Sequence, residues 1–274
     1  MKKIILVLLL SLVLVLTGCS KVKYDWDSKK IVVGLEAAYA PFNWLETEAT
    51  ATNHKLDGMN AYVEGYDVQM AKLIAKDMGV DLVIKMVDWD GLIVSLESGM
   101  IDLIIAGMSP TEDRLKTINF TNSYYESEHV VVVSKTGAFK DATDINDFKN
   151  AKIIGQKGTL YDTIAAEIAT LGKGIHATPL ATIPEIVNSL NTGVNDVTVV
   201  EKPVAISIVT NNPNLKYIKL TTPFTLEESD TIVSIGLRKI DNDLKDAINE
   251  SLSRISLETR EALMLNASTQ APGE

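Results

Sequence analysis

Cysteine is almost missing from this chain, because Cys19 is the only one among 274 residues. One thiol cannot close a disulfide within the chain, so no disulfide framework holds the fold. Clusters of Lys and Arg are missing as well, and the formal net charge is −10. Because nucleic-acid phosphates are bound by gathered positive charge, this acidic balance argues against nucleic acid as a partner.

A hydrophobic run long enough to cross a membrane is also missing. The apolar stretch Ile4–Leu16 has about 13 residues, whereas a spanning helix needs about 20. Lys2 and Lys3 precede it, and a positive start before a short apolar stretch is typical of a secretory signal. The stretch ends in Leu16-Thr17-Gly18-Cys19, which resembles the box of bacterial lipoproteins. The pattern therefore predicts a signal peptide over residues 1–18.

The lipoprotein resemblance implies that Cys19 receives a lipid and becomes the first mature residue. Residues 19–30 are then expected to form a lipidated tether that holds an extracytoplasmic body at the outer face of the cell membrane. The alternative is an uncleaved N-terminal anchor with a chance cysteine. Without residues 1–18, 256 residues and a net charge of −12 remain. That length suffices for one large domain or two ordinary ones.

Short apolar runs alternate with segments of helical periodicity from Ile31 onward, which predicts an α/β fold with mostly parallel, buried sheets. Glu46–Glu64 lacks periodicity and is expected to be a surface loop or small flap, and Asn266–Glu274 is expected to be frayed. No Pro- or Gly-rich linker divides the chain, so two lobes would have to be joined by extended strands. The expected strands are 31–35, 82–87, 103–106, 130–133, 152–155, 197–200 and 231–237, and the expected helices are 66–78, 89–98, 160–170, 184–190, 202–209 and 243–255.

Arg114 is the first candidate for binding chemistry. It lies in the segment Gly107–Arg114, directly after the expected strand 103–106. Ligands of open α/β sheets gather beyond the carboxyl ends of strands, and a guanidinium can hold a carboxylate through two hydrogen bonds. The alternative is a surface arginine paired with Glu112 or Asp113.

Aromatic and acidic residues also follow the expected strands. Tyr39 comes after the first strand and Trp89 after the second, where they could either wall a ligand side chain or cover the core. Glu36 and Glu201 each stand at a strand end, where a carboxylate could bind an ammonium group or begin a helix. Residue type and spacing leave both alternatives open.

Eight blocks of sequence together carry a more specific signal: YAPF at 39–42, GYDV at 65–68, WDGL at 89–92, SGMID at 98–102, GMSPTEDR at 107–114, NFTNSYY at 119–125, KGT at 157–159 and GLRK at 236–239. In this order they resemble the extracytoplasmic solute-binding proteins of ABC importers, in the polar and basic amino-acid group. The resemblance implies a two-lobed, type II periplasmic-binding-protein fold whose lobes are joined by two crossover strands. It places the first lobe at 31–132 and 229–274 and the second at 133–228.

The resemblance also implies a role for each candidate residue. Arg114 would clamp the α-carboxylate of a free amino acid, with help from Ser109 and from a backbone amide near Thr159. Glu201 would take the acidic position for the α-ammonium. The other implied contacts are the Gly107 carbonyl toward that ammonium, Tyr39 and Trp89 as aromatic walls, Glu36 at the far end of the ligand side chain, and Leu160, which replaces a common Thr or Ser and could contribute only its backbone.

The charges of these residues favour a basic ligand. Arg114 and Glu201 balance the two ends of a zwitterion, so Glu36 would be an unpaired buried carboxylate unless a cationic side chain met it. We therefore expect arginine, lysine or ornithine rather than glutamate or leucine, with glutamine or histidine as alternatives. Hinge closure would deliver the ligand to an ABC transporter permease and, indirectly, its ATPase. No cofactor or metal is expected, and the body is expected to be a monomer.

Two other classes remain open. The same fold serves some secreted dehydratases of small carboxylates, but His54, His129 and His176 lack metal-ligand spacing and are interpreted as lone surface histidines. No enzyme is therefore expected. A sensory module would share the binding chemistry, but the chain ends after one body, which favours a transport component.

Overall fold

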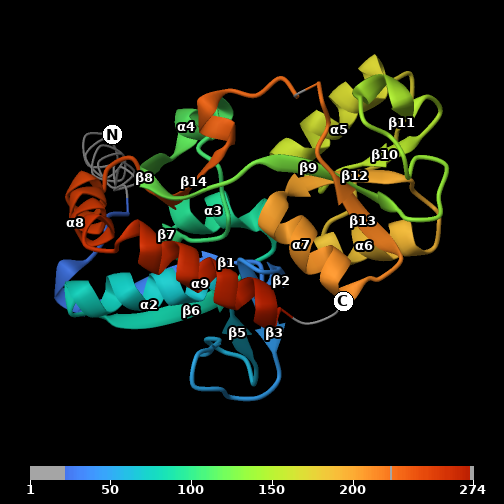
Figure 1. Cartoon of the computed structure of the whole chain (residues 1–274). Helices are drawn as coiled ribbons and strands as arrows, with labels where there is room; N and C mark the ends of the chain where they lie inside the picture. Colours follow the sequence, from blue (N-terminus) through green and yellow to red (C-terminus); the bar gives the residue numbers. More distant parts are fainter. Residues whose placement is uncertain (1–21, 223, 272–274) are drawn as a thin grey trace, which may run out of the picture.

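The computed structural model describes residues 22–222 and 224–271, which form two α/β lobes joined by two passes of the chain (Figure 1). The first lobe has a five-stranded sheet in the order β6-β1-β7-β14-β8. Its strands are β6 (Asp81–Met86), β1 (Lys30–Leu35), β7 (Leu103–Ile104), β14 (Ile232–Leu237) and β8 (Asn119–Glu126). Its helices are α2 (Tyr66–Met78), α3 (Leu92–Glu97), α4 (Glu112–Thr117), α8 (Asn242–Ser253) and α9 (Leu257–Gln270), with 3₁₀ turns at Trp26–Ser28, Trp89–Gly91 and Glu228–Asp230.

The second lobe is built around a second five-stranded sheet in the order β11-β10-β12-β9-β13. Its strands are β11 (Ile175–His176), β10 (Lys152–Ile154), β12 (Val197–Glu201), β9 (His129–Ser134) and β13 (Leu215–Ile218). Helices α5 (Leu160–Leu171), α6 (Ile183–Asn191) and α7 (Lys202–Asn211) surround this sheet, with a 3₁₀ turn at Ile145–Phe148 (Figure 1).

The sheets are less parallel than the sequence predicts. In each large sheet two strand pairs are parallel and two are antiparallel, with β14 and β9 as the reversed strands. The reversal follows from the connections between lobes. The chain leaves the first sheet at Glu126 and enters the second at His129, and it returns between Ile218 and Ile232. These passes are the two crossover segments, which we call the hinge.

Local sequence explains the helix ends. Helix α2 buries Val68, Ala71, Ile74 and Ala75 at helical spacing, and it ends at Gly79, whose φ of 68° is a left-handed conformation that glycine adopts without strain. The predicted helix 66–78 is confirmed. The other expected strands and helices are present with ends shifted by one or two residues, except that 89–98 begins as a 3₁₀ turn and continues as α3.

Two expectations about irregular segments are wrong. Glu46–Glu64 is part of a four-stranded sheet in the order β2-β3-β5-β4, formed by Ala38–Tyr39, Asn43–Glu46, Tyr62–Glu64 and His54–Lys55. Short strands with few apolar residues leave little periodicity to detect. Residues 266–270 belong to helix α9, which packs against both α2 and α7 and is therefore held by both lobes.

The expected tether is ordered in its described part. Tyr24 is buried, its amide donates to Asp241 at 2.9 Å, and its hydroxyl donates to the carbonyl of Lys30 at 3.1 Å. A tether can therefore extend only over residues that precede this contact. The predicted signal peptide 1–18 and Cys19 lie outside the described residues. Within the described residues no helix is long and apolar enough to span a membrane.

Candidate ligand-binding site

A narrow cavity lies between the two lobes, where strands of both large sheets end. Its volume is about 10 Å³, enough for about one water molecule, so the side chains around it nearly touch one another. The structure is therefore closed, and a larger molecule enters only after the lobes move apart. The lining residues are Glu36, Tyr39, Trp89, Gly107, Ser109 and Arg114 from the first lobe and Gln156, Thr159, Leu160 and Tyr161 from the second.

The structure brings eight of the nine predicted site residues to this cavity. The ninth, Glu201, does not line it, but the hydroxyl of the lining residue Tyr39 donates a hydrogen bond to Glu201 Oε2. Residues from distant parts of the sequence thus meet at the boundary between the lobes. Because the predicted residues of the first lobe and those of the second lobe come together here, we choose this cavity as the candidate site.

Two buried carboxylates define the acidic part of the site. Glu36, directly after β1, is 5% exposed, and the Gln156 side-chain amide donates to both of its carboxylate oxygens at 3.1 and 3.3 Å. Burial raises the pKa of Glu36 to about 7. Glu201, at the end of β12, is 2% exposed, and burial raises its pKa to about 8. Among the described residues neither carboxylate has a cationic partner within 4.0 Å.

Arg114 provides the positive charge. Its guanidinium donates to the carbonyls of Ser109 at 3.0 Å and Gly158 at 3.4 Å, and it lies 5.1 Å from the centre of the Trp89 ring. Burial lowers the pKa of Arg114 to about 10, so it remains charged at neutral pH. The alternative of a surface arginine paired with Glu112 or Asp113 is wrong, because Arg114 forms no ion pair among the described residues, and Asp113 pairs with Lys116 at 2.6 Å. The cation is therefore free to bind an anion.

Aromatic rings line the cavity. Tyr39 is stacked on Phe42, with ring centres 5.3 Å apart and an interplanar angle of 7°. Its hydroxyl also lies 3.3 Å from that of Tyr161. Gly107 adopts a φ of 61°, and a Cβ atom there would lie 2.8 Å from Cε1 of Tyr39. Only glycine fits at this position, because any side chain would clash with the Tyr39 ring. The Gly107 backbone therefore packs directly against that ring.

Hydrogen bonds across the cleft hold the two lobes together. The Trp89 indole donates to the carbonyl of Gly158 at 3.0 Å, and Lys157 pairs with Asp90 at 2.6 Å. Since Arg114 donates to the same carbonyl, the turn at Gly158 is a main point of contact between the lobes. Its φ of 71° is a left-handed conformation.

We expect Gly158→Ala to weaken ligand binding about tenfold, because closure is needed for binding. A Cβ atom at Gly158 would lie 2.6 Å from Asp90 Oδ1, and the left-handed backbone adds about 1 kcal/mol of strain. Isothermal titration calorimetry measures the affinity, and small-angle X-ray scattering reports whether the lobes stay apart. Gly193→Ala is the matched control, since Gly193 has the same φ of 71° but no atom within 4 Å of an added Cβ. Equal affinity losses in both variants would contradict the closure argument.

Two lining residues were not predicted from the sequence. Gln156 and Tyr161 flank the expected contact residues Thr159 and Leu160, and both come after β10. Ligands gather beyond strand ends, and Gln156 follows β10 just as Arg114 follows β7. The same rule could therefore have predicted Gln156. The Thr159 hydroxyl caps α5, because it accepts from the Tyr161 amide at 3.1 Å and donates to the Gln156 carbonyl at 2.7 Å.

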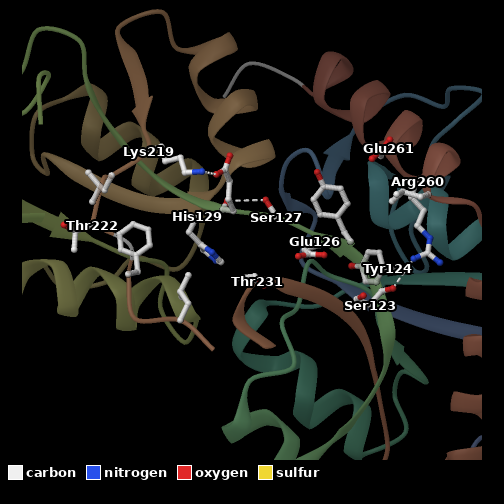
Figure 2. Close-up of a pocket in the computed structure, with 16 residues that line it drawn as sticks. Ser123, Tyr124, Glu126, Ser127, His129, Lys219, Thr222, Thr231, Arg260 and Glu261 are labelled. Carbon is white, nitrogen blue, oxygen red and sulfur yellow. Dashed lines mark hydrogen bonds and ion pairs between the residues drawn. The ribbon is translucent and has the colours of Figure 1, made fainter. Parts of the chain in front are cut away.

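A larger cavity of about 780 Å³ lies along the hinge, beside α9 (Figure 2). Its basic groups already bond within the protein, because Lys219 pairs with Glu128 and Arg260 donates to the carbonyls of Ser123 and Ile255 at 3.1 and 3.2 Å. The smaller cavity is instead lined by Arg114 and Glu36, which have no ion partner among the described residues, and the equally unpaired Glu201 bonds to its lining residue Tyr39. We therefore place the candidate site in the smaller cavity.

His129 lines the hinge cavity and corrects the interpretation of all three histidines as surface residues. It begins β9, is 7% exposed, and neither ring nitrogen has a hydrogen-bond partner among the described residues. Burial lowers the pKa of His129 to about 4, so the ring is neutral at neutral pH. His54 is half-buried and His176 is exposed, 2.8 Å from Asp162. The described residues contain no group of three or more His, Cys, Asp or Glu that could hold a metal.

Comparisons with known proteins agree with this geometry. Residues 31–264 match the model of the bacterial extracellular solute-binding proteins, family 3. The chain is 27% identical to the arginine-binding extracellular protein ArtP of Bacillus subtilis (strain 168), over 93% of each protein. It is 26% identical to the histidine-binding periplasmic protein of Escherichia coli (strain K12), over 93% of this chain and 92% of that protein. Among solved structures it is similar, with a TM-score of 0.75 and 28% identity, to an amino acid ABC transporter substrate-binding protein from Streptococcus pneumoniae Canada MDR_19A bound to L-arginine, covering 89% of this chain and 95% of that one.

Proposed function

The chain belongs to family 3 of the bacterial extracellular solute-binding proteins, and from this we propose that it captures a free basic L-amino acid and delivers it to the permease of an ABC transporter. Arginine is the first choice of ligand, followed by lysine and ornithine. The relatives named above are an arginine-binding and a histidine-binding protein, and the solved structure is an amino acid ABC transporter substrate-binding protein bound to L-arginine, which supports this proposal.

The observation that carries the proposal is the charge content of the closed cavity. Arg114 and the buried carboxylate Glu36 line it, and the buried carboxylate Glu201 accepts a hydrogen bond from the lining residue Tyr39. None of the three has an ion partner among the described residues. Free arginine has the complementary set, with one carboxylate and two cationic groups. Each buried charge would thereby gain a partner, and the cost of its desolvation would be offset. The Trp89 ring next to the guanidinium and Tyr39 would line the path of the ligand side chain.

Gln156 supports a second class of ligand. Its amide already donates to both oxygens of Glu36, and that carboxyl has a pKa of about 7, so it can also be protonated. A protonated carboxyl beside an amide would suit a neutral polar side chain. Glutamine and histidine are therefore the alternative ligands.

Closure supplies the mechanism. The first lobe contributes Glu36 and Arg114, and the second contributes Gln156 and Glu201, so a ligand contacts all of them only when the cleft is shut. A ligand that binds the closed state better shifts the equilibrium toward it. The closed form would dock on the permease and release the amino acid inward, without chemical turnover.

The placement of the protein completes the proposal. A signal peptide over 1–18 would export the chain, and a lipid on Cys19 would hold it at the outer face of the membrane as a monomer. The two lobes that move against each other are proposed to be residues 31–132 with 229–274 and residues 133–228. The strands on either side of the hinge support this division, although β9 already pairs within the second sheet from His129 onward.

Calorimetry of the purified protein with each of the twenty amino acids and ornithine tests the function. We expect tight binding of arginine, weaker binding of lysine and ornithine, and recovery of the bound ligand unchanged by mass spectrometry. Tight binding of glutamate with no response to arginine would overturn the charge argument. Conversion of the ligand would point to the dehydratase class instead.

A further inference from the structure

Two residues at the edge of the binding cavity have left-handed backbone conformations. Ala37 directly follows Glu36 and has a φ of 56°, and Gly107 has a φ of 61°. This region is unfavourable for alanine, so the surrounding structure must hold it in place. The turn at Ala37 sets the direction of the chain directly after Glu36, and the turn at Gly107 lies against Tyr39.

Both turns are held by side chains that bond to one carboxylate, that of Asp67. On one side the Ala37 amide donates to Asn43 Oδ1 at 2.8 Å, and Asn43 Nδ2 donates to Asp67 Oδ2 at 2.8 Å. On the other side the Gly107 amide donates to the Tyr124 hydroxyl at 3.2 Å, and this hydroxyl donates to Asp67 Oδ1 at 2.6 Å. Asp67 thus joins two turns that are 70 residues apart in the sequence.

Asp67 is a fully buried acidic residue, which is uncommon unless hydrogen bonds or a basic group compensate for its burial. The residue is 0% exposed and has no basic partner within 4.0 Å among the described residues. It lies in the first turn of α2, where the helix dipole stabilises a negative charge. Asn43 donates to one oxygen of Asp67 and Tyr124 to the other, so the network uses both oxygens as acceptors. Burial raises the pKa of Asp67 to about 7, and these hydrogen bonds oppose that rise because they favour the ionised form.

We propose that Asp67 is a positioning residue for ligand binding, which holds the turns at Ala37 and Gly107 through Asn43 and Tyr124. Glu36 and the Tyr39 wall are then aimed into the cavity before the ligand arrives. Preorganisation of this kind raises affinity, because fewer groups must be ordered on binding. The inference rests on the proposed function, since it assigns a role within the same site.

Asp67→Asn tests the role by changing one heavy atom, because an NH₂ group replaces one carboxylate oxygen. The asparagine keeps the shape of the side chain but replaces one accepting oxygen with a donor, so one donor in the network loses its partner. Asp241→Asn is the matched control. Asp241 is also 0% exposed in the first lobe, and it accepts from Arg238 Nε at 2.7 Å and from the Tyr24 amide at 2.9 Å, away from the cavity.

The expected result is a difference in affinity between two comparably destabilised proteins. Both variants should lower the melting temperature, but Asp67→Asn should bind L-arginine about tenfold or more weakly, and Asp241→Asn within about twofold of wild type. Hydrogen exchange of the ligand-free proteins, followed by NMR, gives a second readout. The amides of Ala37 and Gly107 should exchange faster in Asp67→Asn, and that of Tyr24 should exchange faster in Asp241→Asn.

Several outcomes would overturn the proposal. They are wild-type affinity in Asp67→Asn, equal affinity losses in both variants, or unchanged exchange at Ala37 and Gly107. If Asp67→Asn does not fold, Tyr124→Phe removes the Gly107 branch alone, so only that amide should exchange faster. If the wild-type protein binds no amino acid, the proposed function fails, but the exchange rates still decide whether Asp67 holds the two turns.

Discussion

Arg114→Ala should abolish amino-acid binding at ordinary ligand concentrations and leave thermal unfolding nearly unchanged. The guanidinium is the only cation that lines the cavity in the described structure, so its loss would leave a ligand carboxylate buried without a partner. Removal of one member of such a pair costs about 2–5 kcal/mol, which corresponds to a loss of affinity between about 30-fold and several thousandfold. Calorimetry with L-arginine measures this loss.

Stability should behave differently from affinity in this variant. Arg114 bonds to two backbone carbonyls and has no ion partner among the described residues, so its removal also relieves a buried charge. Lys116→Ala in the same helix is the control, because Lys116 is exposed and pairs with Asp113. An Arg114→Ala protein that still binds with wild-type affinity would show that the cavity is not the binding site.

Glu36→Gln should change the selectivity of the protein. Loss of the carboxylate removes a charged partner for a basic side chain, and a charge-assisted contact contributes about 1.5–3 kcal/mol. Arginine affinity should therefore fall by about tenfold to a hundredfold, and the preference should move toward glutamine. Competition calorimetry with both amino acids measures the ratio. Glu97→Gln, an exposed change of equal charge in the same lobe, should leave it unaltered.

The pH dependence of the same variant gives an independent check. Because the pKa of Glu36 is about 7 in the closed protein without ligand, arginine affinity should rise between pH 6 and 8 as this carboxyl ionises. The ligand-free closed protein should become less stable as pH rises from about 4.5, the ordinary pKa of Glu, to about 7, because the folded state binds a proton over this range that the unfolded state has lost. Glu36→Gln should flatten both profiles, and the remaining slope would belong to Glu201, whose pKa is about 8, and to Asp67, whose pKa is about 7. Unchanged slopes would contradict the assignment.

Periodicity predicted the elements that bury an apolar face. The helix 66–78 and the strand that begins near Ile31 are clear cases, since a regular apolar pattern needs no distant information. It failed for Glu46–Glu64 and for residues 266–270, where short polar strands and a helix of weak amphipathicity are held by contacts with other parts of the chain. The sequence likeness to a known family predicted the family and the two-lobed fold, which the comparisons bear out.

Only the tertiary structure decided which groups share the cavity and what their charges do. The sequence alone determined that carboxylates, aromatic rings and a guanidinium follow strand ends, because strand ends can be located from local patterns. It could not show that Gln156 bonds to Glu36 across 120 positions, that His129 is buried, or that Asp67 holds two turns. Burial and hydrogen bonding between distant segments depend on how the lobes pack, and the spacing of residues along one strand or helix carries no record of that packing.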